Sequence, residues 1–144
     1  MPAWVSAGYE EYAKRLPRDH AVQLVELKPE PRDRGRTVAQ LLAAEAQRIR
    51  NACTGCEIVA LDERGAAWTT RMLAEQLQRR SANGETVAFV VGSADGLDES
   101  VKREASAVVA LSALTLPHGM VRVLLAEQIY RAVSLLSGHP YHRD

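Results

Sequence analysis

The sequence has no excess charge of either sign, because its 144 residues include 18 basic and 18 acidic side chains. A net positive field that attracts nucleic acid is therefore excluded, and any such contact has to come from a local patch. No apolar run approaches the roughly 18 residues needed to cross a membrane, and the N-terminus carries acids where a secretion signal has bases. We expect a cytoplasmic protein with no membrane partner.

Cysteine is scarce, since Cys53 and Cys56 are the only two, in the stretch Cys-Thr-Gly-Cys. A structural zinc site needs a second ligand pair at short spacing, and His139 and His142 lie far along the chain. We therefore interpret the cysteines as small residues at a turn and predict no metal site. The sequence also lacks the glycine fingerprint of dinucleotide-binding enzymes and the phosphate loop of nucleoside-triphosphate enzymes, which counts against both classes.

Helix-like and strand-like patterns alternate along the chain. Apolar residues at helical spacing predict helices over residues 4–16, 37–49, 70–77, 98–105 and 119–136. Short apolar runs predict strands over residues 21–27, 57–61, 86–92 and 107–111, with an exposed loop over 28–36. Such alternation indicates a parallel sheet covered by helices on both faces, so we predict an α/β fold. The length suits a single domain, residues 1–144.

Three loops follow predicted strands, over residues 62–65, 92–97 and 112–117. The carboxyl ends of parallel strands share one edge of the sheet, where ligands bind, so these loops can converge on one site. Gly92 and Gly96 would let the backbone approach a ligand closely, although a simple turn explains two such glycines as well. The tail at residues 139–143 holds two histidines, a tyrosine and an arginine, which indicates a contact surface.

Several longer motifs resemble those of a known protein family. They are Val-Val-Gly at residues 90–92 with Asp-Gly-Leu at 95–97, Leu-Ser-Ala-Leu-Thr-Leu-Pro-His at 111–118, Glu-Gln-Ile-Tyr-Arg-Ala at 127–132 and His-Pro-Tyr-His-Arg at 139–143. With these motifs the sequence resembles the bacterial ribosomal RNA large subunit methyltransferase H family over essentially its whole length. That family belongs to the SPOUT class of methyltransferases.

The resemblance implies features that hydrophobic periodicity cannot reveal, because knots are nearly absent among folds. It implies a C-terminal trefoil knot in the parallel sheet, S-adenosyl-L-methionine bound in that knot, and a homodimer. It also implies methylation of N3 of a pseudouridine in large-subunit (23S) ribosomal RNA. Two alternatives stay open: a non-catalytic, ribosome-associated RNA-binding module, and a SPOUT methyltransferase that acts on another RNA.

The resemblance further implies a cofactor site. The positions that match the family's cofactor-binding residues are Leu61, Gly92, Ser93, Ser112, Ala113, Leu114, Thr115, Leu116 and Pro117. Apolar side chains can hold an adenine ring while loop amides and carbonyls bond its edge. For Leu116, plain packing in the core explains the residue as well as direct contact does.

Loss of the proton on N3 calls for a base, or for a group that stabilises the developing anion. We predict His118, His142 and Arg143 as catalytic residues, although capping or packing explains His118 equally well. The residues predicted to contact RNA are Arg34, Arg36, Arg122, His139 and Tyr141. For the arginines of the first loop, a solvated surface is an equally good explanation. The tail should be docked, because a chain end normally frays otherwise.

Two features depart from the family pattern. Members begin with a short apolar strand before the Met-Pro-x-Trp stretch at which this sequence starts, so we expect the sheet to lack that first strand. Ser93 stands where the family usually has a second glycine. If the position needs only a small residue, serine fits and adds a hydrogen bond, whereas a positive φ would cost on the order of 1 kcal/mol.

Overall fold

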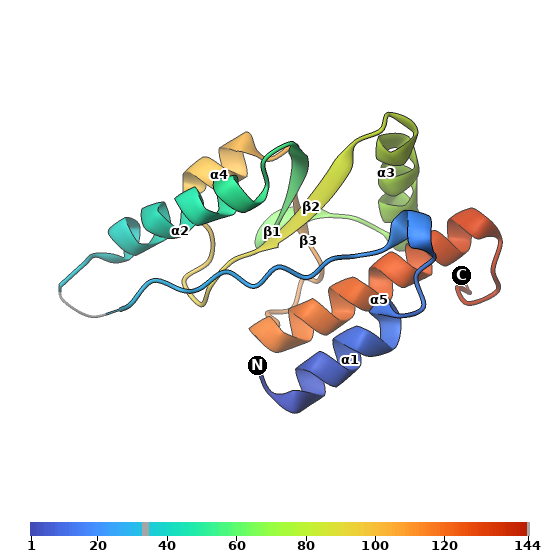
Figure 1. Cartoon of the computed structure of the whole chain (residues 1–144), viewed down its shortest axis with the longest axis horizontal. Coiled ribbons are helices and arrows are strands. Elements are labelled where there is room, and N and C mark those ends of the chain that lie inside the picture. Colours follow the sequence, from blue (N-terminus) through green and yellow to red (C-terminus); the bar gives the residue numbers. More distant parts are fainter. Residues whose placement is uncertain (33–34, 144) are drawn as a thin grey trace.

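The computed structural model describes residues 1–32 and 35–143. Within these residues three parallel strands form one sheet: β1 (Cys56–Ala67), β2 (Thr86–Val91) and β3 (Ala107–Ala110). The strand order is β2-β1-β3, so β1 is central and is hydrogen-bonded on both sides (Figure 1). The predicted α/β class and parallel sheet are confirmed.

Helices cover both faces of the sheet (Figure 1). Val101 packs with Val90 of β2 on one face, whereas Phe89, the preceding residue of β2, packs with Leu73 and Ala132 on the other. Successive strand residues point to opposite faces, so β2 is covered on both, as its unbroken apolar run predicted. The helices are α1 (Ala3–Ala13), α2 (Val38–Ala52), α3 (Thr70–Ala82), α4 (Glu99–Glu104) and α5 (His118–Ser137), with a 3₁₀ turn η1 (Arg18–His20).

The longest helix, α5, packs within its own chain. It buries Ala126 and Ile129, and α1 lies along it (Figure 1). Val5 of α1 is fully buried, and a Cβ at Gly119 would lie only 2.7 Å from its Cγ2. Glycine therefore lets these two helices approach closely. In the part of the chain that the structure describes, no helix is long and apolar enough to cross a membrane.

Capping residues fix where two of the helices begin. The Thr37 hydroxyl accepts a hydrogen bond from the Gln40 amide at 3.1 Å, and the Gln40 side chain accepts one from the Thr37 amide at 2.9 Å. This capping box starts α2. Thr69 accepts in the same way from the Met72 amide at 3.1 Å and starts α3. Both helix starts lie where the sequence predicted them.

Residues 21–27 are extended but belong to no strand of the described sheet, so the strand predicted there is wrong (Figure 1). A strand requires a neighbour that pairs with its backbone amides and carbonyls, and this segment has none among the described residues. Its large apolar side chains are consequently exposed: Val22, Leu24, Val25 and Leu27.

The central strand is longer than predicted. A turn was expected at residues 62–65, but β1 continues through them to Ala67. The pairing with β3 is irregular there, because Leu61 and Ala66 both lie opposite Val109. A Cβ at Gly65 would lie 2.7 Å from backbone atoms of Val108, so glycine lets β1 pass close to β3. The expected turn is therefore an irregularity within a strand.

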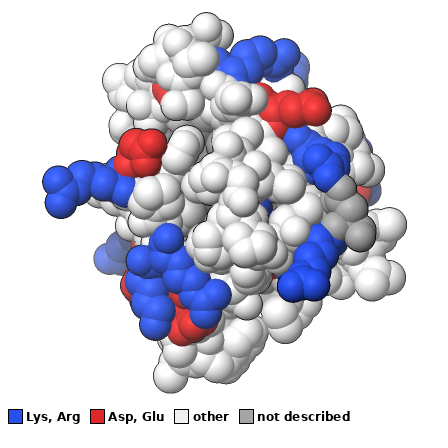
Figure 2. Space-filling model, turned by 90° about the vertical axis from the view of Figure 1, so that its right-hand side faces the viewer, with Lys and Arg blue, Asp and Glu red and all other residues white. Residues whose placement is uncertain are grey.

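Positive charge gathers at one end of the molecule, which carries α3, the last turns of α5 and the C-terminal tail. Figure 2 shows basic side chains around a largely uncharged centre on this side, with fewer acidic ones. Because the net charge is zero, such a local patch is what contact with RNA would require. The basic residues of the elements at this end include Lys14, Arg15, Arg18, Arg71 and Arg79.

Candidate functional site

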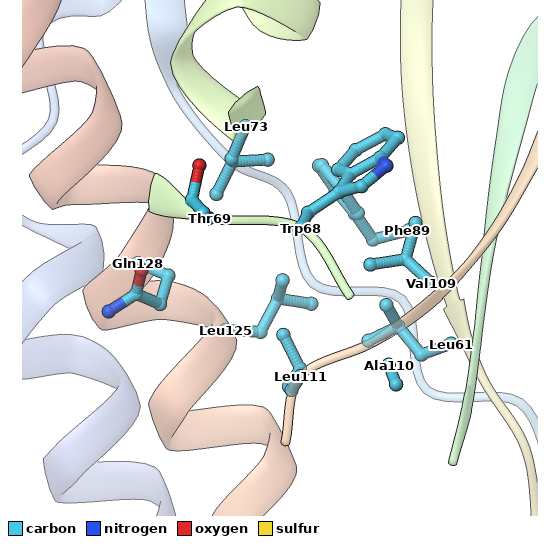
Figure 3. Close-up of a pocket in the computed structure, with 10 residues that line it drawn as sticks. All are labelled: Leu61, Trp68, Thr69, Leu73, Phe89, Val109, Ala110, Leu111, Leu125 and Gln128. Atoms are coloured by element: carbon cyan, nitrogen blue, oxygen red, sulfur yellow. The ribbon is translucent and has the colours of Figure 1, made fainter. Parts of the chain in front are cut away.

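A hollow lies between the sheet and helices α3 and α5 (Figure 3). It comprises about 420 Å³ of space, part of it open solvent. An apolar lining with a few polar groups is usual for a site that holds a small organic molecule. The apolar lining residues are Leu61, Trp68, Leu73, Phe89, Val109, Ala110, Leu111 and Leu125, and the polar ones are Thr69 and Gln128.

Of the predicted cofactor residues, one lines this hollow and the others follow strands β2 and β3, which contribute to its wall. Leu61 lines it directly, in the central strand. Residues 112–117 start immediately after Leu111, a lining residue, and lead to α5. Gly92 and Ser93 lie in the loop that follows β2. The predicted positions other than Leu61 therefore follow the ends of β2 and β3, and of the whole set only Leu61 forms the wall of the hollow.

The segment at residues 112–117 is held at two points and is otherwise open. The Ser112 hydroxyl accepts a hydrogen bond from the Leu114 amide at 2.9 Å. The Thr115 hydroxyl donates to Glu63 at 3.2 Å, which ties the segment to β1. Leu114 is 73% exposed, an unusual position for a large apolar side chain. Ser112 and Leu116 are half-buried, and the exposed residues are Ala113, Leu114, Thr115 and Pro117.

The loop after β2 is a tight turn that depends on glycine. A Cβ at Gly92 would lie 2.5 Å from the carbonyl oxygen of Gly96. Gly96 itself has a φ of +86° and donates its amide to the Ser93 carbonyl at 2.8 Å. The Ser93 hydroxyl donates to Glu45 of α2 at 3.0 Å, so the hydrogen bond expected of this serine is present. The loop is thereby fastened to the helix behind it.

An ion pair that the sequence pattern did not indicate anchors β1 beside the hollow. Asp62, next to Leu61, accepts from Lys102 of α4 at 2.7 Å and from the Arg64 amide at 2.8 Å. The hydrogen bond from Lys102, together with that from the Arg64 amide, lowers the pKa of the Asp62 carboxyl below its usual value. The two partners are far apart in the sequence, so no local signal could have revealed the pair.

The C-terminal tail folds back onto α5. Gly138 ends the helix with a φ of +73°, and the His139 amide donates to the Ser134 carbonyl at 2.9 Å. The ring of Tyr141 meets that of Tyr130 edge-on, with centroids 4.7 Å apart. The guanidinium of Arg131 lies 4.8 Å from the centre of the Tyr141 ring. The tail is therefore docked, as we expected, and it packs against α5, the helix that precedes it.

Polar contacts also hold the tail against α5. The Tyr141 hydroxyl donates to Glu127 at 3.2 Å, and the Tyr141 amide donates to Nδ1 of His139 at 3.2 Å. Burial, with a contribution from the Glu127 carboxylate, raises the pKa of Tyr141 to about 12, so the phenol keeps its proton at neutral pH. Nδ1 of His142 lies 3.4 Å from the Arg131 guanidinium, and Arg143 is exposed.

Comparison with known proteins decides the family. The family model for predicted SPOUT methyltransferases matches residues 1–142. A protein of Nitrosospira multiformis called Ribosomal RNA large subunit methyltransferase H is 56% identical over 99% of this chain and 92% of its own length. Proteins of the same name from Burkholderia multivorans and Bordetella pertussis are 53% and 54% identical over the same shares. The chain belongs to the SPOUT methyltransferase family.

In this SPOUT methyltransferase, the residues predicted to contact RNA do not form one cluster. His139 and Tyr141 lie at the end of α5, whereas Arg122 lies near its start and pairs with Glu26 at 3.0 Å. Arg36 pairs with Glu30 at 3.0 Å in the loop before α2. Arg34 lies outside the described residues. Sequence reasoning left out Arg71 and Arg79, which only the position of α3 brings to the basic end.

The cysteines of this SPOUT methyltransferase form the turn that the sequence predicted. Cys53 caps the end of α2, and the Cys56 amide donates to the Cys53 carbonyl at 2.9 Å. Gly55 has the positive φ, +79°, that the turn requires. Within residues 1–32 and 35–143, no group of three or more His, Cys, Asp or Glu side chains lies close enough to hold a metal ion.

Proposed function

We propose that this chain transfers a methyl group from S-adenosyl-L-methionine to N3 of a pseudouridine in 23S ribosomal RNA. The observation that carries the proposal is the 56% identity, over 99% of the chain, to a protein called Ribosomal RNA large subunit methyltransferase H. The motifs at residues 111–118 and 139–143 support it, because they resemble that family at the positions where a cofactor loop and a catalytic tail are expected.

The residues around the hollow suit this methyl donor. Leu61, Trp68 and Phe89 offer apolar surface for an adenine ring, and Gln128 offers a polar group for its edge. The open segment at residues 112–117 offers backbone amides and carbonyls beside them. The donor supplies an activated methyl group when bound, so the chain has only to hold and orient the reactants and to exclude water.

The docked tail suits the charge that develops when N3 loses its proton. A guanidinium can only donate, so Arg131 donates to Nδ1 of His142, and the imidazole then carries its proton on Nε2. That Nε2–H group can donate a hydrogen bond to the developing anion, and the N3 proton itself passes to solvent. Arg143, the next residue, adds a permanent positive charge. These two residues are our proposed catalytic pair.

His118 cannot join this pair within one chain. It stands at the start of α5 and the tail at its end, and a helix of 20 residues is about 30 Å long. We therefore propose a homodimer in which one copy brings its His118 to the tail of the other. Large apolar side chains near the start of α5 are exposed, as an interface between copies requires: Trp4, Leu114 and Met120.

The dimer and the shared site can be tested by complementation. His118→Ala and Arg143→Ala are each expected to be inactive alone. Mixed in equal amounts after unfolding and refolding, they should regain about a quarter of the parent activity, because half of the dimers would hold one intact site of two. Light scattering should give the mass of a dimer. No recovery on mixing, with both variants dimeric, would contradict the shared site.

The methyl transfer itself is tested with ribosomal RNA from a strain lacking the gene. Purified protein and S-adenosyl-L-methionine should add one methyl group to a single pseudouridine, read by mass spectrometry of the digested RNA. Calorimetric titration should give cofactor binding to the folded protein. Binding without methylation of this RNA would favour a methyltransferase for another RNA. No binding would favour a non-catalytic RNA-binding module.

A further inference from the structure

Tyrosine rings and guanidinium groups lie against one another beside the docked tail. The ring of Tyr130 in α5 has its centroid 6.5 Å from that of Tyr12 in α1 and 4.7 Å from that of Tyr141 in the tail. The guanidinium of Arg15 lies over the rings of both helices, 5.4 Å from the centre of Tyr12 and 5.7 Å from that of Tyr130. The guanidinium of Arg131 lies over the Tyr141 ring. One cluster thus joins α1, α5 and the tail.

Arg15 is the exposed member of this cluster, since the three tyrosines and Arg131 are half-buried. Glu11, one turn earlier in the chain, accepts a hydrogen bond from Arg15 and pairs with Lys14 at 3.1 Å. The two rings and this bond hold the planar guanidinium in one orientation, while 38% of the Arg15 side chain stays open to solvent. A ligand can therefore reach Arg15 without rearranging the cluster.

A guanidinium plane supported by aromatic rings is a surface on which an RNA base can stack. Unpaired RNA bases are recognised by stacking on aromatic side chains or on arginine planes, and each stacked base strengthens binding by about 5- to 150-fold. Lys14 and Arg18, on either side of Arg15 in the sequence, are exposed and can contact the phosphates. The tail beside the cluster carries the proposed catalytic pair, so a base held here would be a neighbour of the target.

We propose that Arg15, held over Tyr12 and Tyr130, stacks on an unpaired RNA base close to the nucleotide that the tail meets. The inference rests on the proposed function for its partner, an RNA. Arg15, both rings and the tail belong to the same copy of the chain, so the contact does not depend on which copy holds the donor. Because Arg15 does not touch the reacting atoms in this scheme, it binds and orients the RNA and takes no part in the transfer itself.

Two other roles for Arg15 predict different behaviour. An arginine that only met a phosphate would be replaced well by lysine, because lysine keeps the charge and loses only the plane. An arginine that only supported the tail would, when replaced, weaken every RNA contact alike. Stacking instead requires that the loss depend on the presence of bases in the RNA.

The test compares two probes of equal charge. One is a single-stranded oligoadenylate of about ten nucleotides, within the usual range of site sizes, and the other is the same sugar–phosphate backbone without bases. Fluorescence anisotropy at one fixed salt concentration gives both Kd values. Arg15→Lys removes the plane and Tyr12→Leu removes a supporting ring, whereas Tyr12→Phe keeps that ring. Arg103→Lys is the matched control, since Arg103 is an exposed arginine on α4, which covers the other face of the sheet from α5.

We expect the parent to bind oligoadenylate at least about fivefold more tightly than the base-free backbone, as one stacked base requires. Arg15→Lys and Tyr12→Leu should lower this ratio at least about fivefold, with the Kd for the backbone within about twofold of the parent. Tyr12→Phe and Arg103→Lys should match the parent. With RNA from the strain lacking the gene, Arg15→Lys should raise KM and leave kcat nearly unchanged. Arg15→Lys decides the matter if Tyr12→Leu does not fold.

Three results would overturn the inference. A parent that binds both probes equally has no stacking site, and an Arg15→Lys variant that keeps the parent's ratio shows that Arg15 meets only phosphate. Equal weakening of both probes in Arg15→Lys shows a structural role. A parent that methylates no RNA would refute the proposed function instead, and the two probes would still decide this inference, because stacking does not depend on the RNA sequence.

Discussion

Gly92 offers a direct test of the loop that follows β2, because replacing it with alanine places an atom where none fits. The new Cβ would lie 2.5 Å from the carbonyl oxygen and 2.6 Å from the carbonyl carbon of Gly96, and 3.0 Å from Cγ of Leu97. Carbon atoms in contact prefer about 3.5–4.0 Å, so the backbone at Gly96 has to move. That movement breaks the hydrogen bond from the Gly96 amide to Ser93.

The cost can be worked out from these two effects. Overpacking of this kind costs about 1–3 kcal/mol, and the lost hydrogen bond adds about 0.5–1.5 kcal/mol. For a chain of this length we expect Gly92→Ala to lower the Tm by about 5–15 °C. Donor affinity should fall as well, because Gly92 and Ser93 are two of the predicted cofactor positions.

Circular dichroism during heating measures the Tm, and calorimetry measures donor binding. Gly55→Ala is the matched control: Gly55 has a φ of +79° but no atom within 4 Å of the added Cβ. That variant carries only the backbone strain, about 1–2 kcal/mol, and lies away from the hollow. A Gly92→Ala variant with the parent's Tm and donor affinity would show that the loop does not have this shape.

Three further variants test other parts of the site. Arg143→Ala should lower turnover at least about tenfold with donor affinity nearly unchanged; equal kcat in variant and parent would remove this residue from the catalytic pair. Ser93→Gly breaks the bond to Glu45 and should reduce the free energy of unfolding in urea by about 1 kcal/mol, whereas a gain would mean that serine is strained there. The pKa of the Asp62 carboxyl is lowered in the folded state, so its pair with Lys102 should stabilise the fold at any pH above the ordinary pKa of an aspartate. This stabilisation should disappear as the pH falls through the lowered pKa. The difference in unfolding free energy between parent and Asp62→Asn should accordingly shrink below about pH 4; a difference that persists there would contradict the assigned cause.

Local signals predicted the elements whose structure is decided locally. Thr37 and Thr69 stand at the starts of apolar-periodic runs, and both cap helices. Residues 21–27 and residues 86–91 both have a strand-like pattern, yet only the latter are in the sheet. The difference lies in a pairing partner, which periodicity cannot supply. The continuation of β1 past Leu61 likewise depends on β3, far along the chain.

For the candidate site too, local motifs predicted some features, and contacts between distant elements decided the others. Motifs placed Leu61 and the segment at residues 112–117 near one another, and the structure has them beside the hollow. The contacts of Lys102 with Asp62 and of Gln128 with Thr70 escaped sequence reasoning because the partners come from other elements. The predicted knot, the homodimer and the roles of the catalytic residues stay predictions, and the complementation experiment addresses the last two.

The docked tail is ordered before RNA binds. The pKa of Tyr141 is raised to about 12, so its hydroxyl is protonated and remains a donor to Glu127 across the physiological range. RNA therefore meets a tail that is already ordered, and the entropy of ordering it is not lost again on binding. The tail lies at the same end of the molecule as α3, which carries Arg71 and Arg79 (Figure 1). In the proposed function, phosphate contacts there hold the RNA while His142 and Arg143, which follow the anchored Tyr141, reach the base.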